Sequence, residues 1–240
     1  MLLRGVIFDV HGTIIDKGSR ETLMQALANA ADYLAEQGYN ITFEDYFRVW
    51  SSNLKRIAEN KEDFWEPNFN QWQSGIFRDL GMSDYDESSA QNLNKRFMEA
   101  FASATKALPH AHEVLAELKK EYLLGIASNS MAQNTALDLE RTGLHGYFDV
   151  VLTSSEIGRR KPHPLLFQET LARLKLKVEE AVLVGDHPIE DIGGAHQVGM
   201  RAILVCHPQY GLLPDFLPGE PHPEAVITDF RELKGVLSRL

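Results

Sequence analysis

The chain has 240 residues, of which 44% are hydrophobic, so it can bury a full core as one large domain or as one domain with a sizeable insertion. Its formal net charge of −10 and its pI near 5.4 exclude broad electrostatic attraction to nucleic acid or to an anionic membrane surface. An anionic substrate therefore needs a local cationic site. Cys206 is the only cysteine, so no internal disulfide can form and a cytoplasmic location is predicted. No run reaches the roughly 18 apolar residues of a membrane span.

Six short apolar runs bounded by turn residues recur along the chain, as is typical of buried parallel strands. They lie at residues 5–8, 123–127, 150–153, 181–184, 202–205 and 225–227. Helical patterns separate most of them, at 112–121, 132–142, 164–174 and 189–198. This alternation predicts an α/β fold with a Rossmann-like, doubly wound parallel sheet.

The interval 16–106 separates the first two predicted strands and has a different character. Its apolar residues are spaced by three and four, which predicts helices. We therefore expect an inserted α-helical cap domain at 16–106 and an α/β core formed by 1–15 and 107–240. This interval contains 14 of the 22 aromatic residues of the chain, including all three tryptophans, Trp50, Trp65 and Trp72. They indicate either a small core filled by bulky side chains or an apolar substrate pocket.

The segment 207–224 contains five prolines and is predicted to be an irregular loop after the fifth strand. Loops after strand ends border the ligand crevice of an open α/β sheet. This loop is therefore expected either to rim the site or to be a passive surface segment.

Residues able to carry chemistry gather near the predicted carboxyl ends of strands. They are Asp9, His11, Gly12 and Thr13; Ser128, Asn129 and Ser130; Lys161 before Pro162; and Gly185, Asp186, Glu190 and Asp191. Taken singly, most have a simpler interpretation, since aspartate, serine and asparagine often cap helices and a run of cationic residues is often solvated. Their convergence on one sheet edge indicates a binding site.

The chemistry of these groups is that of a phosphate and magnesium site. Backbone amides in a tight loop at Gly12 can face an anion, and the side chains of Ser128 and Asn129 can donate hydrogen bonds to it. Carboxylates such as Asp186 and Asp191 suit Mg²⁺, which favours one or two carboxylates together with water and substrate oxygens.

Four motifs occur in the order of the haloacid dehalogenase superfamily, and the resemblance covers the whole chain. They are Phe8-Asp9-Val10-His11-Gly12-Thr13, Ser128-Asn129, Lys161-Pro162-His163-Pro164, and Gly185-Asp186 with Asp191-Ile192-Gly193-Gly194-Ala195. The insertion between the first two motifs resembles the helical C1 cap of that family.

The resemblance implies a magnesium-dependent hydrolase, and specifically a phosphatase for a small phosphorylated molecule. Asp9 would attack phosphorus and form an aspartyl-phosphate that water then hydrolyses. The expected Mg²⁺ ligands are the Asp9 carboxylate, the His11 backbone carbonyl and Asp186, with Asp191 in support. The expected phosphate ligands are Gly12, Ser128, Asn129 and Lys161, and the expected catalytic residues are Asp9, His11 and Lys161. A monomer and a homodimer are both compatible with the sequence.

His11 departs from the family pattern, which has a second aspartate at this position as acid and base. Three interpretations follow: His11 replaces the carboxyl as general acid and base, the protein binds phosphate with feeble turnover, or the chemistry is that of a dehalogenase or a phosphonate-type hydrolase. A zinc site of His163, His187 and His207 is disfavoured because their spacing matches no compact zinc motif.

Overall fold

The computed structural model describes residues 2–16, 18–102, 104–210 and 221–240. The chain divides into two compact units, Met1–Asp16 with Ala107–Leu240, and Lys17–Lys106. Among the described residues no helix is long and apolar enough to cross a membrane.

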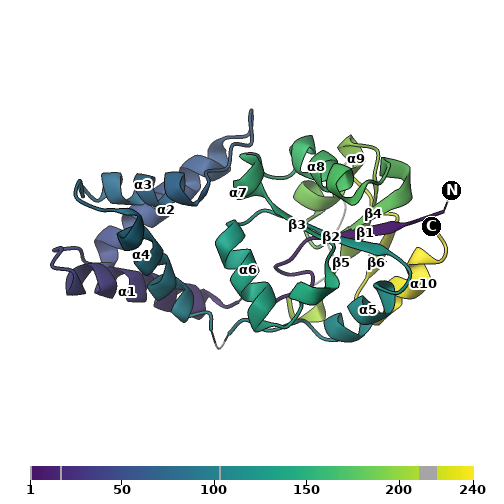
Figure 1. Cartoon of the computed structure of the whole chain (residues 1–240), viewed down its shortest axis with the longest axis horizontal. Helices are drawn as coiled ribbons and strands as arrows, with labels where there is room; N and C mark the ends of the chain where they lie inside the picture. The colour runs from purple at the N-terminus through teal and green to yellow at the C-terminus, as the bar shows by residue number, and fades with distance from the viewer. Residues whose placement is uncertain (1, 17, 103, 211–220) are drawn as a thin grey trace. The chain divides into compact units, whose positions relative to one another are not determined.

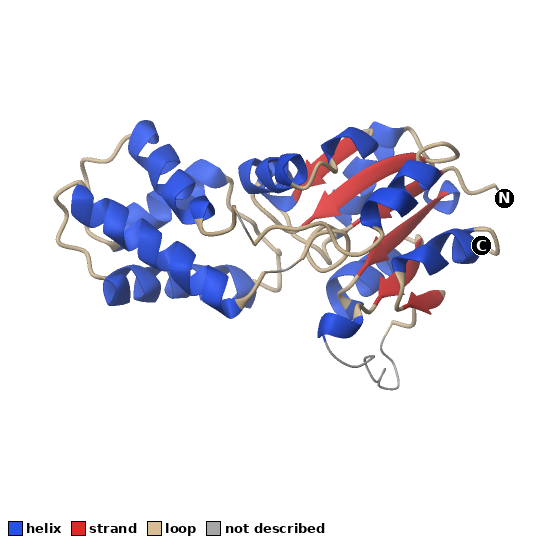
Figure 2. Cartoon of the chain, turned by 90° about the horizontal axis from the view of Figure 1, so that it is seen from below, coloured by secondary structure: helices blue, strands red, loops and turns tan. Residues whose placement is uncertain are grey.

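The first unit is built on one six-stranded parallel sheet, which confirms the predicted fold class (Figures 1 and 2). Its strands are β1 (Gly5–Phe8), β2 (Leu123–Ser128), β3 (Val150–Thr153), β4 (Ala181–Gly185), β5 (Arg201–Val205) and β6 (Ala225–Ile227), in the order β3-β2-β1-β4-β5-β6. Every strand lies on a predicted apolar run, with ends that differ by at most one residue. β1 occupies an interior position between β2 and β4.

Side chains alternate between the two faces of the sheet, so each face buries its own core. On β1, Val6 and Phe8 belong to one hydrophobic cluster and Ile7 to the other. The first cluster includes residues of α5 (Ala111–Leu118), α6 (Ala132–Arg141), the short turn η5 (Phe230–Glu232) and α10 (Leu233–Leu237). The second includes residues of α8 (Pro164–Leu174) and α9 (Gly194–Gln197), on the opposite side in Figure 1. Burial of both faces explains why the strands read as nearly continuous apolar runs.

Strand register brings the predicted site residues to one edge of the sheet. Phe8 pairs with Ile126 of β2 and with Val184 of β4. The chain therefore leaves β1 at Asp9, next to the ends of both neighbouring strands.

The helix predicted at 189–198 is an α-helix only in its second half, over α9. The preceding residues, Pro188–Gly193, form a π-helical segment, η3. The His187 carbonyl accepts from the N–H groups of both Asp191 and Ile192, at 3.0 and 3.3 Å. The His187 Nδ1 atom accepts from the backbone N–H groups of Ile189 and Glu190. The bond from the Ile192 N–H, five residues after His187, is the π-type bond of this wider turn, which apolar spacing alone does not reveal.

Short elements complete the first unit. They are α7 (Ser154–Ile157), η1 (His145–Tyr147), η2 (Val178–Glu180) and η4 (Pro208–Tyr210). The loop predicted at 207–224 thus begins with a 3₁₀ turn, and its residues 211–220 lie outside the described part of the chain.

The described residues of the second unit form four helices whose first turns are capped by side chains. They are α1 (Arg20–Glu36), α2 (Phe43–Glu59), α3 (Phe69–Asp79) and α4 (Glu87–Glu99). Ser19, Thr42, Asn68 and Asp86 each accept a backbone N–H of the following turn, as N-cap residues do.

Aromatic residues mainly fill the core of this helical unit. Phe77 is fully buried and stacks on Tyr85 with ring centroids 4.3 Å apart. Trp50 and Trp72 pack edge to face against the same core, with centroids 6.4 Å apart. The core interpretation of the aromatic residues therefore holds for these four. Trp65 and Trp72 also line a pocket of about 530 Å³.

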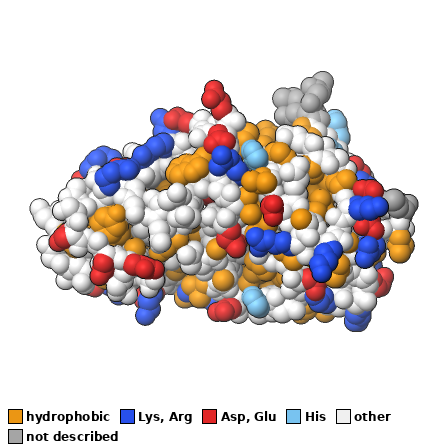
Figure 3. Space-filling view, turned by 45° about the horizontal axis from the view of Figure 1, so that its top comes forward, with side chains coloured by type: hydrophobic (Ala, Val, Ile, Leu, Met, Phe, Trp, Pro, Cys, Tyr) orange, Lys and Arg blue, Asp and Glu red, His pale blue; other side chains and the backbone are white. Residues whose placement is uncertain are grey.

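The surface carries charges of both signs. Acidic and basic side chains are interspersed on the face shown in Figure 3.

Candidate active site

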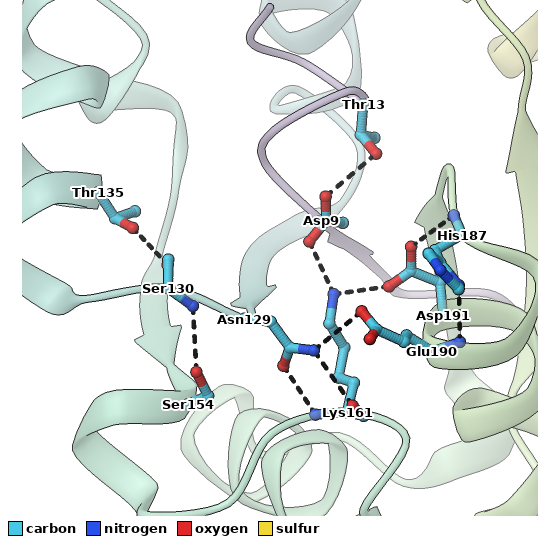
Figure 4. A network of polar contacts seen from close by, with 10 residues as sticks. All are labelled: Asp9, Thr13, Asn129, Ser130, Thr135, Ser154, Lys161, His187, Glu190 and Asp191. Carbon is cyan, nitrogen blue, oxygen red and sulfur yellow. Dashed lines mark hydrogen bonds and ion pairs between the residues drawn. The ribbon is translucent and has the colours of Figure 1, made fainter. Parts of the chain in front are cut away.

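Asp9 stands at the centre of a buried polar network at the end of β1 (Figure 4). Its N–H donates to the Val184 carbonyl at 2.9 Å, which continues the pairing with β4 by one residue. Asp9 is 8% exposed. Its Oδ1 accepts from Lys161 Nζ at 2.7 Å, and its Oδ2 accepts from the Thr13 hydroxyl at 3.4 Å. Oδ2 is thus the less firmly held oxygen.

Lys161 supplies one buried cation to this network. Its side chain is 1% exposed, and Nζ also donates to Asp191 Oδ1 at 2.6 Å. Burial alone would lower the pKa of Lys161, but the Asp191 and Asp9 carboxylates outweigh it and hold that pKa above its ordinary value. Lys161 is therefore charged in the folded protein. It is also the deeply buried member of its basic run, since Arg159 and Arg160 are only half-buried.

Asn129 fixes the backbone of Lys161. Its Oδ1 accepts from the Lys161 N–H at 2.7 Å, and its Nδ2 donates to the Lys161 carbonyl and to Glu190 Oε2, both at 3.1 Å. The Asn129 amide is thus occupied by the protein, and its role as a phosphate ligand stays a prediction. The hydroxyl of Ser128, which is 2% exposed at the end of β2, makes no hydrogen bond to any described residue.

Hydroxyl groups order the loop that follows Ser128. The Ser130 N–H donates to Ser154 Oγ at 3.1 Å, and the hydroxyls of Ser130 and Thr135 lie 2.6 Å apart. This ties the end of β2 to α6 and α7. The position of Ser128 is thereby fixed from its C-terminal side.

Asp191 is brought to the site by η3 and by a glycine on the adjacent strand. Its Oδ2 accepts from the His187 N–H at 2.9 Å. A Cβ on Gly185 would lie 2.4 Å from Asp191 Cγ, a distance that a real Cβ does not reach. Gly185 is therefore required by the close approach of this carboxylate. Burial raises the pKa of Asp191, as does the Asp9 carboxylate, while Lys161 opposes both.

Three carboxylates could hold a cation here. Oxygen atoms of Asp9, Asp186 and Asp191 all lie within 4.8 Å of one another, and no other such group of His, Cys, Asp or Glu occurs among the described residues. A set of hard oxygen donors is the ligand type of Mg²⁺. Both Asp191 oxygens accept short hydrogen bonds, at 2.6 and 2.9 Å, whereas Asp9 Oδ2 accepts only a long one at 3.4 Å. Asp191 therefore fits an accessory position better than a direct ligand.

The loop after Asp9 uses its own amides. Gly12 has φ of +93°, and its N–H donates to the Ile15 carbonyl at 2.7 Å. The Thr13 N–H donates to the Val10 carbonyl at 3.3 Å. The phosphate-binding role of Gly12 stays a prediction, since in this conformation its N–H closes the loop.

His11 has a partner that the sequence did not reveal. Its Nε2 lies 3.0 Å from Oδ2 of Asp138, a residue of α6 that is 6% exposed. The available signal was the spacing of Asp138, three residues after buried Thr135 and next to buried Leu139, which places a carboxylate on the inward side of the helix.

The three histidines weighed as zinc ligands have other tasks. His163 Nδ1 accepts from the Leu165 N–H, His187 caps η3, and buried His207 donates from Nε2 to the Thr13 carbonyl at 3.1 Å. His207 thus supports the loop after Asp9 from the start of the proline-rich segment.

Comparisons with known proteins agree with this geometry. A family model for haloacid dehalogenase-like hydrolases matches residues 6–205. The chain is 30% identical, over 244 residues, to the glyceraldehyde 3-phosphate phosphatase of Methanothermobacter thermautotrophicus, covering 98% of this chain and 100% of that protein.

Two solved structures are similar over nearly the full length. One is a 2-haloacid dehalogenase from Pseudomonas syringae pv. Tomato DC3000, with 30% identity, a TM-score of 0.74 and 99% of each chain covered. The other is a HAD phosphatase from Thermococcus onnurineus, with 28% identity, a TM-score of 0.70 and 98% of each chain covered.

Proposed function

The chain belongs to the haloacid dehalogenase-like hydrolases, and we propose that it is a magnesium-dependent phosphatase that uses Asp9 as its nucleophile on a small phosphorylated molecule. The proposal rests on one observation: the buried Lys161 ammonium lies 2.7 Å from Asp9 and 2.6 Å from Asp191, beside a third carboxylate, Asp186. We further assign the chain to the branch with a C1-type cap, because the helical unit Lys17–Lys106 follows β1.

Magnesium would be held by the Asp9 carboxylate, Asp186 and the His11 backbone carbonyl, with Asp191 in support. The ion would supply charge neutralisation for the phosphoryl group, the main requirement of phosphoryl transfer. Lys161 adds a positive charge from the protein itself, held next to Asp9. The Ser128 hydroxyl is free to donate a hydrogen bond to a phosphoryl oxygen.

The reaction then takes two displacements at phosphorus. An Asp9 carboxylate oxygen attacks phosphorus, the bond from phosphorus to the leaving oxygen breaks, and His11 gives that oxygen a proton. In the second step His11 takes a proton from water as the water oxygen attacks phosphorus. The bond between phosphorus and Asp9 breaks, and inorganic phosphate and free Asp9 result.

The relatives support a small substrate. The relative from Methanothermobacter thermautotrophicus is named glyceraldehyde 3-phosphate phosphatase. Another relative, from Nitrosococcus oceani, is named phosphoglycolate phosphatase. We therefore propose phosphate monoesters of short, polar carbon chains as the substrate class.

Dehalogenation is the second candidate, because a 2-haloacid dehalogenase structure is as similar in sequence as the full-length phosphatase relative, at 30% identity. There Asp9 would attack the carbon that bears the halogen, halide would leave, and water would hydrolyse the resulting ester. That reaction needs no metal, so it gives no role to the approach of Asp186 and Asp191 to Asp9.

The test is a panel of phosphate monoesters, phosphonates and 2-haloacids, assayed for phosphate and halide release with Mg²⁺ and with a chelator. We expect Mg²⁺-dependent phosphate release that Asp9→Asn abolishes. Asp32→Asn, at an exposed position of α1, is the matched control and should retain full activity. Halide release that persists in chelator would establish the dehalogenase. Phosphate binding without release of either product would establish a binding protein.

A further inference from the structure

His11 and Asp138 form a contact that joins the loop after β1 to helix α6. The two residues are 127 positions apart in sequence, and His11 Nε2 lies 3.0 Å from Asp138 Oδ2. The His11 side chain is 34% exposed and that of Asp138 only 8%. The His11 ring makes no other hydrogen bond to a described residue, so none of these residues occupies Nδ1.

Asp138 is more deeply buried than an ordinary surface carboxylate. It lies on the buried face of α6, together with the fully buried Leu139 and Thr135. Its other oxygen, Oδ1, lies 3.8 Å from Arg141 Nη1. Arg141 thus offsets part of the cost of burying a carboxylate, while the shorter contact is directed at His11.

We propose that Asp138 is a positioning residue for His11, an inference that rests on the phosphatase function proposed above. By accepting the Nε2 hydrogen, Asp138 fixes the orientation and tautomer of the imidazole and leaves Nδ1 as the nitrogen that can exchange a proton with the substrate or water. The side chain of histidine is larger than that of aspartate, and its ring carries two distinct nitrogens where the carboxylate has two equivalent oxygens. A histidine at this position therefore needs an orienting partner that an aspartate does not.

The contribution of Asp138 is one of preorganisation. General acid and base catalysis typically contributes about 10²–10⁴-fold to rate, and it depends on holding the group in the productive geometry. Loss of the orienting carboxylate should therefore lower kcat by roughly 10–100-fold. KM should change little, because the hydrogen bonds of Asp9 and Lys161 go to other residues, and Asp138 reaches the site through His11.

Two measurements test the proposal. The first is the ¹⁵N NMR spectrum of histidine-labelled protein at alkaline pH, with His11 assigned by its loss in His11→Asn. We expect His11 in the Nε2–H tautomer, and a mixture of tautomers in Asp138→Asn. The second is steady-state kinetics of Asp138→Asn, which should show the loss in kcat at nearly constant KM. In a His11→Asn background the Asp138 change should have little further effect on kcat.

Glu140→Gln is the control, because Glu140 is exposed on the same helix and should leave both the spectrum and kcat unchanged. An Nδ1–H tautomer in the unaltered protein would overturn the proposal. So would a kcat of Asp138→Asn within twofold of that protein. If no phosphate ester is hydrolysed at all, the proposed function fails, and the NMR spectrum alone then decides whether Asp138 positions the ring.

Discussion

Replacement of Lys161 by methionine would remove the cation and keep a side chain of similar length. In the structure its side chain is 1% exposed, and its ammonium contacts Asp9 at 2.7 Å and Asp191 at 2.6 Å. Methionine would leave two buried carboxylates facing each other without the charge between them. Breaking a buried pair by removing one partner costs about 3–5 kcal/mol, a large part of the roughly 5–15 kcal/mol that stabilises a folded domain.

The assay must report on the α/β unit itself. All three tryptophans lie in the helical unit Lys17–Lys106, so tryptophan fluorescence would follow the wrong part of the chain. Native-state hydrogen exchange of peptides from β1 and β4, measured in chelator, reads the stability of the sheet directly. At about 1.4 kcal/mol for each factor of ten, a cost of about 3–5 kcal/mol makes the expected exchange in Lys161→Met roughly 10² to 4 × 10³ times faster.

Lys234 provides the matched control for this substitution. It is an exposed lysine whose two carboxylate contacts are longer, at 3.5 Å to Glu117 and 3.3 Å to Glu121. Exposed pairs of this kind contribute little, so Lys234→Met should leave exchange of β1 and β4 unchanged. Equal exchange in Lys161→Met and in the unaltered protein would refute the view that the cation holds the buried carboxylates together.

Two further substitutions test how the sheet edge is built. Gly185→Ala would place a Cβ 2.4 Å from Asp191 Cγ and displace that carboxylate. The rate of phosphate release should therefore fall at least about tenfold. Gly146→Ala is the control, because Gly146 has open space around it, and this variant should retain full activity. Burial raises the pKa of Asp149, but its hydrogen bonds and the nearby lysine outweigh this and hold that pKa below its ordinary value. Its stabilising effect is therefore complete above the unfolded pKa of about 3.9 and is lost as pH falls through the folded pKa. Asp149→Ala leaves the buried Leu124 N–H without its acceptor, and we expect a loss of about 1–3 kcal/mol at neutral pH in denaturant unfolding and a weaker dependence of stability on acid.

The strands and the order of the motifs were predictable because their causes are local. A strand buried on both faces is an unbroken apolar run, and β1 at Gly5–Phe8 is read directly from four residues. The parallel arrangement then places the residue after each run at one edge of the sheet. The closeness of Asp9 to Ser128 and Asp186 follows from topology more than from any single motif.

The parts that sequence could not supply depend on distant side chains. The contact between His11 and Asp138 spans 127 positions, and nothing around either residue marks the other. The π-helical segment η3 is capped at its first amides by the His187 side chain, an arrangement that apolar spacing does not encode. Asn129 has the residue type of a phosphate ligand, and only the three-dimensional structure shows that the Lys161 backbone occupies its amide.

The charge balance of the site leads to a last prediction about ligand binding. Asp9, Asp186 and Asp191 bring three carboxylates together, and Lys161 brings one ammonium, so with all four groups ionised the cluster is negative. A phosphate dianion should therefore bind poorly unless a divalent cation is present. We expect inorganic phosphate with Mg²⁺ to slow hydrogen exchange of β1 and β4, and phosphate with chelator to leave it unchanged. Equal protection in chelator would mean that Lys161 and Ser128 alone overcome the carboxylates, which would contradict the magnesium requirement without any appeal to turnover.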